Sequence, residues 1–307
     1  DNRCVKDIGK CGEKMKITFK RKDNDYPGYK EYIKPVVDQA FFSDTFIEIL
    51  CEILNVFNEY SNDICYKILK ALKLGEFKVN EKEKDAYKSF SNSLYSFYYN
   101  VVSDDFGKFI FSKNQDLYNK NSLRRLQRYR GLLFEALVTK IVSIRFEEGE
   151  FETGCKVYIN SNMILIHYGE GNAKHKETFD FAGWKEKEKY GEFHEFKINP
   201  SRFTKENYQL FAELIRQLNI NNVSNYLVSV ACADFTTNMK ECIKSIEETM
   251  EDTEKIKFEV YGRDKLASLG SKCAPNKSYL LQMSNDYSEG KYDTAFEELA
   301  EEGTILS

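Results

Sequence analysis

The stretch Thr178–Pro200, TFDFAGWKEKEKYGEFHEFKINP, decides the fold of this chain. Residues 178–183 and 192–198 at its two ends alternate in polarity and carry aromatic side chains, which predicts two strands. The charged residues between them are typical of the loop of a β-hairpin. A symmetric hairpin pairs positions whose numbers sum to 375, so we expect Asp180 directly opposite Glu195.

The second strand of this hairpin also brings a lysine to the two carboxylates. Because side chains alternate along a strand, Glu195 and Lys197 share one face of the sheet and His194 points to the other. Two carboxylates held this close repel each other unless a cation lies between them or one takes up a proton. Oxygen ligands on a rigid sheet suit Mg²⁺ or Mn²⁺ better than zinc. With Lys197 beside the metal, the pattern predicts a site equipped for phosphodiester hydrolysis.

Helical and strand patterns alternate on both sides of the hairpin. The apolar run Tyr226–Ala233 is typical of a buried central strand. We expect helices and further strands in the following places: helices over 122–144, 204–218, 239–250 and 263–269, and strands over 156–160, 163–168 and 257–261. Ser122 is the expected N-cap of the first of these helices. The order predicts an α/β fold, a sheet with helices on its faces.

The N-terminal part has a different pattern. A short strand is expected within Lys14–Arg21, and residues 43–102 repeat apolar side chains at helical spacing, which predicts three helices. We therefore divide the chain into a mainly helical accessory region over 1–115, an α/β domain over 116–272 and an acidic tail over 273–307.

One carboxylate lies in an otherwise apolar helical stretch. Glu135 stands in Tyr129–Val138, YRGLLFEALV, next to Phe134 and close to Leu133 and Leu137. An ionised carboxylate is costly in such surroundings unless it is paired or helps to bind a metal. We therefore expect Glu135 to join the carboxylates of the hairpin.

Together these residues resemble the PD-(D/E)XK nuclease superfamily over about Ser122–Leu269, half of the chain. In that pattern a helix acid comes first, here Glu135. An Asp at the strand hairpin follows, here Asp180, and then the E-x-K strand, here Glu195 with Lys197.

The resemblance implies a restriction-endonuclease-like fold, a mixed sheet flanked by helices, and Mg²⁺-dependent cleavage of DNA or, less often, RNA. It implies a metal site made of four groups: Asp180, Glu195, Glu135 and the main-chain carbonyl of Phe196. It also makes Tyr208 and Gln209, on the helix behind the strands, candidate supporting residues. The chain departs from the pattern at Phe179, which stands where a proline precedes the Asp.

The resemblance further implies a wider biological setting. Related nucleases are frequent in bacterial anti-phage defence, where accessory helical regions recognise a substrate or a partner protein such as a helicase or ATPase. Cutting both strands of a duplex would favour a homodimer. Two alternatives stay open: a catalytically inactive domain that binds nucleic acid or protein, and a nuclease that cleaves RNA.

Charge is distributed unevenly along the chain. The chain has 45 Lys and Arg against 49 Asp and Glu, a net charge of −4, which argues against a uniformly basic nucleic-acid binder. Lys120–Lys140 nevertheless carries a local net charge of +5. We expect four of its side chains to contact a nucleic-acid backbone: Arg124, Arg125, Arg128 and Arg130. Asp286–Glu302 has a local net charge of −6, and we hypothesise that this tail covers the basic stretch.

The cysteine and hydropathy patterns predict a cytoplasmic protein. The eight cysteines include no C-x-x-C pair, which argues against zinc. No apolar stretch has the roughly 20 residues that a bilayer span needs. The sequence printed here also shows no apolar leader, so we expect no membrane partner.

Overall fold

The computed structural model describes residues 15–21, 32–57, 63–111, 115–251 and 255–271. For residues 101–111, 115–123, 125, 270 and 271 it describes only the helical backbone. The acidic tail over 273–307, and with it the hypothesis that the tail covers a basic surface, lies outside the described residues.

The helical region contains the three predicted helices and one that the sequence patterns missed. The predicted helices are α2 (Asp44–Val56), α3 (Ile64–Gly75) and α4 (Lys84–Phe111). Helix α2 begins at the N-cap Ser43, whose hydroxyl accepts a hydrogen bond from the Thr45 N–H. The additional helix is α1 (Lys34–Ala40), which has Pro35 in its first turn, a position where proline is tolerated.

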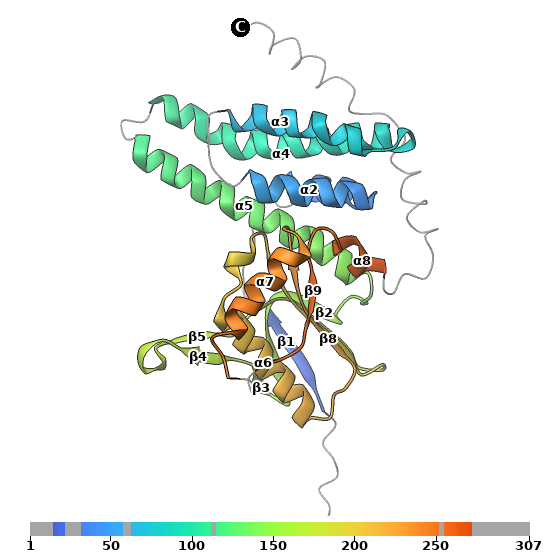
Figure 1. Ribbon diagram of the computed structural model, residues 1–307, viewed down its shortest axis with the longest axis vertical. Helices are drawn as coiled ribbons and strands as arrows, with labels where there is room; N and C mark the ends of the chain where they lie inside the picture. The colour runs from blue at the N-terminus through green and yellow to red at the C-terminus, as the bar shows by residue number, and fades with distance from the viewer. Residues whose placement is uncertain (1–14, 22–31, 58–62, 112–114, 252–254, 272–307) are drawn as a thin grey trace, which may run out of the picture.

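Helix α5 (Gln115–Ser143) connects this region to the sheet (Figure 1). It begins seven residues before Ser122, so the predicted N-cap is wrong and Ser122 lies inside the helix. Apolar side chains of α5 share one buried cluster with residues of α1 to α4 and with Phe181 and Phe196 of the sheet. The helical region is therefore packed on the sheet through α5.

A seven-stranded mixed sheet forms the centre of the α/β part. Its strand order is β1-β2-β6-β7-β8-β9, with β3 paired to β2 at the side. The strands are β1 (Ile17–Arg21), β2 (Phe151–Ile159), β3 (Asn162–Met163), β6 (Phe179–Lys185), β7 (Tyr190–Lys197), β8 (Tyr226–Cys232) and β9 (Glu259–Tyr261). The β7–β8 and β8–β9 pairs are parallel, and the other pairs are antiparallel.

Helices cover both faces of the sheet, as the α/β prediction requires. One face packs on α5 and α8 (Leu266–Ser271). The other packs on α6 (Lys205–Ile220) and α7 (Thr236–Glu247), which lie in front of the sheet in Figure 1. The chain passes from β7 through α6 into the parallel neighbour β8, so the carboxyl end of β7 and the start of α6 lie close together.

A separate two-stranded sheet differs from the sequence prediction, which gave one strand over 163–168 and none over 174–176. Residues 163–168 divide into the end of β3 and a short strand β4 (Ile166–Tyr168), which pairs with β5 (Lys174–Lys176) instead of the main sheet. We call β4, β5 and the residues between them the ribbon.

Candidate active site

The hairpin β6–β7 has the register that alternation predicts. Phe181 pairs with His194 and Lys185 pairs with Tyr190, and both pairs sum to 375. The strand pairing ends at Phe181, so the expected backbone pair of Asp180 with Glu195 does not form; instead the Asp180 carboxylate accepts a hydrogen bond from the Phe196 N–H at 2.6 Å. The backbone of the E-x-K strand thus holds the carboxylate of the first candidate ligand.

Asp180 lies where strand β6 changes face. Phe179 and Phe181 are two residues apart, yet Phe179 packs on the α6 side and Phe181 on the α5 side. On the neighbouring strand Gly154, at φ +53°, stands between the partners of these two residues. Other residues are strained in that conformation. Asp180 lies at this break in alternation, and its carboxylate contacts the Phe196 N–H and Lys197.

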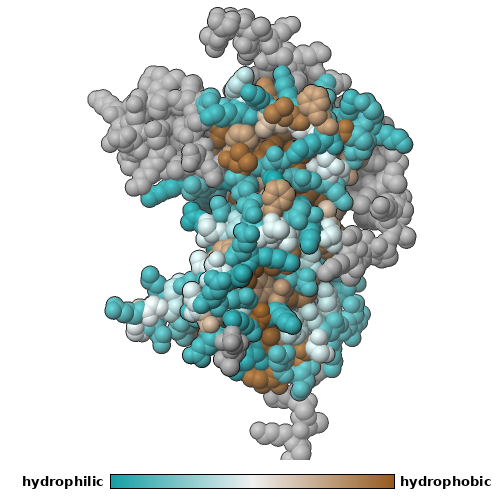
Figure 2. Space-filling model, in the orientation of Figure 1, coloured by the Kyte–Doolittle hydropathy of each residue, from teal (hydrophilic) through white to brown (hydrophobic). Residues whose placement is uncertain are grey.

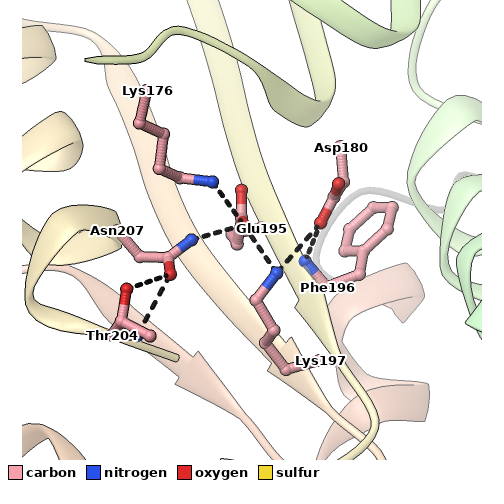
Figure 3. Close-up of polar contacts among 7 residues, drawn as sticks. All are labelled: Lys176, Asp180, Glu195, Phe196, Lys197, Thr204 and Asn207. Atoms are coloured by element: carbon pink, nitrogen blue, oxygen red, sulfur yellow. Dashed lines mark hydrogen bonds and ion pairs between the residues drawn. The ribbon is translucent and has the colours of Figure 1, made fainter. Parts of the chain in front are cut away.

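Glu195 and Lys197 lie at the carboxyl end of β7 and on the same face, as predicted. The Lys197 Nζ is 2.6 Å from Glu195 Oε1 and 3.7 Å from Asp180 Oδ2, so one ammonium group joins both carboxylates (Figure 3). Glu195 is 2% exposed. The carboxyl ends of strands next to a parallel crossover are a common place for ligand sites.

The two oxygens of Glu195 differ sharply in their surroundings. Oε1 accepts hydrogen bonds from Lys197, from the Lys176 ammonium at 3.2 Å and from the Asn207 amide. Oε2 is buried and has no hydrogen-bond partner in the described part of the chain. Since an unsatisfied buried acceptor is costly, the second oxygen is suited to accept a ligand.

Asn207 is oriented by the start of helix α6. Its Oδ1 accepts hydrogen bonds from the N–H and the hydroxyl of the N-cap residue Thr204, at 3.0 and 3.1 Å. The amide nitrogen is thereby turned toward Glu195. A capping interaction thus also positions a site residue.

Glu135 of α5 is electrostatically part of the same group. Burial raises the pKa of Glu135 to about 8, and the nearby charge of Asp180 adds to this effect. Burial and the charge of Glu195 likewise raise the pKa of Asp180 to about 6. Burial lowers the pKa of Lys197, but the charges of Asp180 and Glu195 outweigh this and hold it above its usual value.

These shifts predict that the metal-free protein loses stability with rising pH. The folded state binds a proton at Glu135 more tightly than the unfolded chain, whose ordinary pKa is 4.5. The contribution of this group is therefore complete below pH 4.5 and is lost as pH rises through about 8. Glu135→Gln removes this titration, so we expect it to raise the free energy of unfolding by about 2 kcal/mol at pH 8.5 and by much less at pH 5.

Chemical unfolding in EDTA at both pH values measures this difference. Glu148→Gln, at an exposed position, is the matched control and should follow the wild type. If Glu135→Gln is no more stable than Glu148→Gln at pH 8.5, burial does not raise the pKa of Glu135 in the way that its surroundings indicate.

Two expected supporting residues are not at the site. Tyr208 points away from Glu195: its hydroxyl donates to Glu247 of α7 at 3.0 Å and accepts from the Ile256 N–H at 2.8 Å. Gln209 is partly exposed, and no hydrogen bond joins it to the carboxylates in the described structure. Asn207, the residue before Tyr208, takes the supporting position, because its amide donates to Glu195 on β7.

The four arginines expected to contact nucleic acid are placed differently from one another. Arg124 and Arg128 are exposed on α5. The side chain of Arg125 lies outside the described residues. Arg130 is 5% exposed and donates to the Leu54 carbonyl of α2, so the prediction that it contacts a nucleic-acid backbone is wrong. It stabilises the packing of α5 on α2.

His194 faces away from Glu195, as alternation predicts, and belongs to a buried polar network. Its Nε2 is 2.9 Å from Glu192 Oε2, and its Nδ1 is 2.6 Å from Ser229 Oγ. Arg145 donates to both oxygens of Glu192, at 2.7 and 2.5 Å. Burial lowers the pKa of His194, whereas hydrogen bonds from His194 and Arg145 lower the pKa of Glu192 to about 2 despite burial.

Sequence patterns did not single out Lys176 and Asn207. A sequence signal exists for Asn207, because Thr204-x-x-Asn207 has the spacing of an N-cap residue and a capping partner in the first turn of a helix. We find no sequence signal for Lys176, since its contact depends on how the ribbon packs on the main sheet.

Two comparisons with known proteins found no match. No model of a known protein family matches the chain, and no curated protein matches it significantly. Within the described ranges, no helix combines the length and apolarity needed to cross a membrane.

Proposed function

We propose that this protein is a metal-dependent nuclease of the PD-(D/E)XK type that hydrolyses phosphodiester bonds in DNA. The observation that carries the proposal is the carboxylate of Glu195. One of its oxygens accepts hydrogen bonds from three donors, and the other is buried with no hydrogen-bond partner among the described residues. An acid built into a protein in this way is typical of a cation ligand.

The donor set fits a small hard cation. Among the described residues, no three His, Cys, Asp or Glu side chains form a ready-made metal cage. Mg²⁺ does not require such a cage, because it is usually held by one or two carboxylates and keeps several waters. Asp180 and Glu195 would supply these carboxylates, with Glu135 and the Phe196 carbonyl beside them. When bound, Mg²⁺ or Mn²⁺ would act as a Lewis acid and lower the pKa of a bound water.

Electrostatics at the site also favour a cation. When all are ionised, Glu135, Asp180 and Glu195 face the ammonium groups of Lys176 and Lys197, which leaves one net negative charge. Burial is the main cause of the raised pKa values of Glu135 and Asp180, and the neighbouring carboxylates raise them further, so a bound cation would favour the ionised form of both groups.

The chain's own side chains would bind and polarise the substrate. Lys197 lies between the two carboxylates and can donate to a phosphate oxygen, where it stabilises the negative charge that grows in the transition state. Asn207 and Lys176 hold Glu195 in one orientation. Glu135 carries a proton at neutral pH in the metal-free state and can release it when the site gains positive charge.

The order of elements supports the same reading. The helix acid lies on α5, the Asp on β6, the E-x-K sequence on β7, and α6 packs behind these strands. This is the order that the resemblance to the superfamily implies. Action in bacterial defence, a helicase or ATPase partner, a homodimer and a cytoplasmic location remain proposals from the resemblance alone.

A cleavage panel tests the proposed function. Purified protein is incubated with linear, supercoiled and single-stranded DNA and with RNA, in Mg²⁺, in Mn²⁺ and in EDTA. We expect cleavage of DNA that requires the divalent metal. If no substrate is cut in any condition, the inactive binding domain becomes the better interpretation, and cleavage restricted to RNA would favour the other alternative.

A further inference from the structure

The ribbon stands apart from the seven-stranded sheet. In the described structure β4 and β5 pair only with each other, and Ile166, His167 and Tyr168 face Lys176, His175 and Lys174 in turn. Residues 169–175 are all exposed. Figure 1 shows the ribbon projecting from the sheet domain on the side below the helical region. Ile166 packs against the core on the α6 side, whereas the outer part of the ribbon is exposed and available for contact.

The ribbon presents cationic and hydrogen-bonding side chains. His167 and His175 form an exposed cross-strand pair with ring centroids 6.3 Å apart. Lys174 is exposed and forms no ion pair with any described residue. The acid at the base, Glu177, pairs with Lys156 at 2.5 Å, and its other oxygen lies 3.5 Å from His175 Nε2. In the outer part of the ribbon Lys174 is balanced by one acid, Glu170, so a ligand there would be recognised through hydrogen bonds from Lys174 and the two histidines and not through a net positive charge.

The base of the ribbon is joined to the candidate active site. Lys176, the last residue of β5, reaches Glu195 Oε1 at 3.2 Å. Figure 2 shows the outline of the molecule hollowed between the ribbon and the helical region above it. A ligand lying along the ribbon would thus pass close to the carboxylates.

We propose that the ribbon enters the major groove of B-form duplex DNA and thereby selects duplex DNA as the substrate. The proposal rests on the proposed nuclease function. The major groove of B-DNA is about 12 Å wide and admits a two-stranded β-ribbon. The major groove of A-form RNA is too deep and narrow for side chains to read, so the same ribbon discriminates against RNA duplexes.

The ends of the ribbon are suited to this role. The tip contains the small residues Gly169, Gly171 and Ala173, which keep it narrow. Lys174 can donate to the O6 and N7 of guanine or to a phosphate, and His167 and His175 can donate to or accept from base edges. Contacts of this kind would hold the duplex near the candidate active site, because the ion pair between Lys176 and Glu195 joins the ribbon to that site.

A binding experiment with the full chain tests the ribbon. Fluorescence anisotropy with a 20-base-pair DNA duplex in Ca²⁺, used in place of Mg²⁺ to limit cleavage, compares wild type with Lys174→Ala/His175→Ala. We expect the double variant to bind at least about tenfold more weakly and to have a shallower salt dependence. The control Lys187→Ala/Lys189→Ala changes two exposed lysines at the β6–β7 turn and should bind within about twofold of wild type.

A second set of ligands tests which groove is used. We expect wild type to bind an RNA duplex of the same sequence, and a DNA duplex with bulky groups at C5 of its cytosines, at least about tenfold more weakly. A minor-groove ligand should not compete. Equal binding of DNA and RNA duplexes, or of wild type and the ribbon variant, overturns the proposal.

The two proposals fail separately. If wild type cuts DNA and the ribbon variant binds like wild type, only the ribbon proposal is lost. If wild type cuts nothing but the ribbon variant binds duplex DNA more weakly, the nuclease function is lost, and the ribbon remains a DNA-binding element.

Discussion

Replacing Lys197 with alanine is expected to reduce Mg²⁺-dependent DNA cleavage at least about 100-fold while leaving the fold intact. The ammonium group lies 2.6 Å from Glu195 and 3.7 Å from Asp180, so it is the positive charge nearest to both candidate ligands. Removing one preorganised donor to a developing oxyanion typically lowers kcat by a factor of 10² to 10³. Glu195 keeps two donors, Lys176 and Asn207, so its carboxylate is not left unpaired.

Single-turnover cleavage with excess protein measures this effect without a contribution from product release. The matched control is Lys187→Ala, at an exposed position of the β6–β7 turn, which should cleave like wild type. Binding of DNA in Ca²⁺ separates chemistry from affinity, and we expect Lys197→Ala to bind within a few-fold of wild type. Cleavage by Lys197→Ala at the wild-type rate would refute the assignment of the active site.

The second large effect is on stability, at the buried network behind the sheet. We expect Arg145→Ala to lower the free energy of unfolding by about 3 to 5 kcal/mol, because it removes the guanidinium that pairs with both oxygens of the buried Glu192 carboxylate. The side chains of Arg145 and Glu192 are 4% and 0% exposed, and Arg145 also donates to the Leu269 carbonyl at 2.6 Å. The variant therefore loses hydrogen bonds that join the turn after α5 to β7 and α8.

An exposed pair of the same type provides the control. Arg216 donates to both oxygens of Glu213 at 2.7 Å, but its side chain is 56% exposed, so Arg216→Ala should change stability by less than about 1 kcal/mol. Urea unfolding at pH 7 compares the two variants. Similar losses in both would show that burial does not determine the strength of the Arg145–Glu192 pair.

The same network makes the stability of the fold depend on pH in acid. The pKa of Glu192 is lowered to about 2, so its contribution to stability is present above the ordinary pKa of 4.5 and is lost as pH falls through about 2. In Arg145→Ala this loss should begin at a higher pH, because the guanidinium is gone and only His194 and the Tyr190 hydroxyl still hydrogen-bond the carboxylate.

Much of the candidate site follows from local sequence patterns. Symmetric closure of the hairpin over residues 178–198 predicts strand partners whose numbers sum to 375, and the β6–β7 pairs in the structure follow this rule. The shared face of Glu195 and Lys197 follows from the same alternation. The apolar helical sequence around Glu135 was enough to single it out, because an ionised carboxylate among buried apolar side chains costs free energy unless it is paired.

Other features depend on contacts between distant segments. Arg130 has the same local charge pattern as Arg124 and Arg128, but α2 packs against its side of α5, and the guanidinium is buried at the Leu54 carbonyl. Helical periodicity identified α6, whereas the choice between Asn207 and Tyr208 as the residue facing Glu195 depends on the rotation of α6 on the sheet. Asp180 departs from regular alternation because β2 and β6 break their pairing at Gly154.

The sequence alone determined the α/β class, the hairpin and the three carboxylates with their lysine, because polarity patterns reflect which side of an element is buried. The tertiary structure decided the contacts of these groups. One oxygen of Glu195 accepts three hydrogen bonds, the other has no partner among the described residues, and Lys176 joins the ribbon to the site. The physical reason is that hydrogen bonds and desolvation depend on distances between segments far apart in the chain, which local periodicity does not encode.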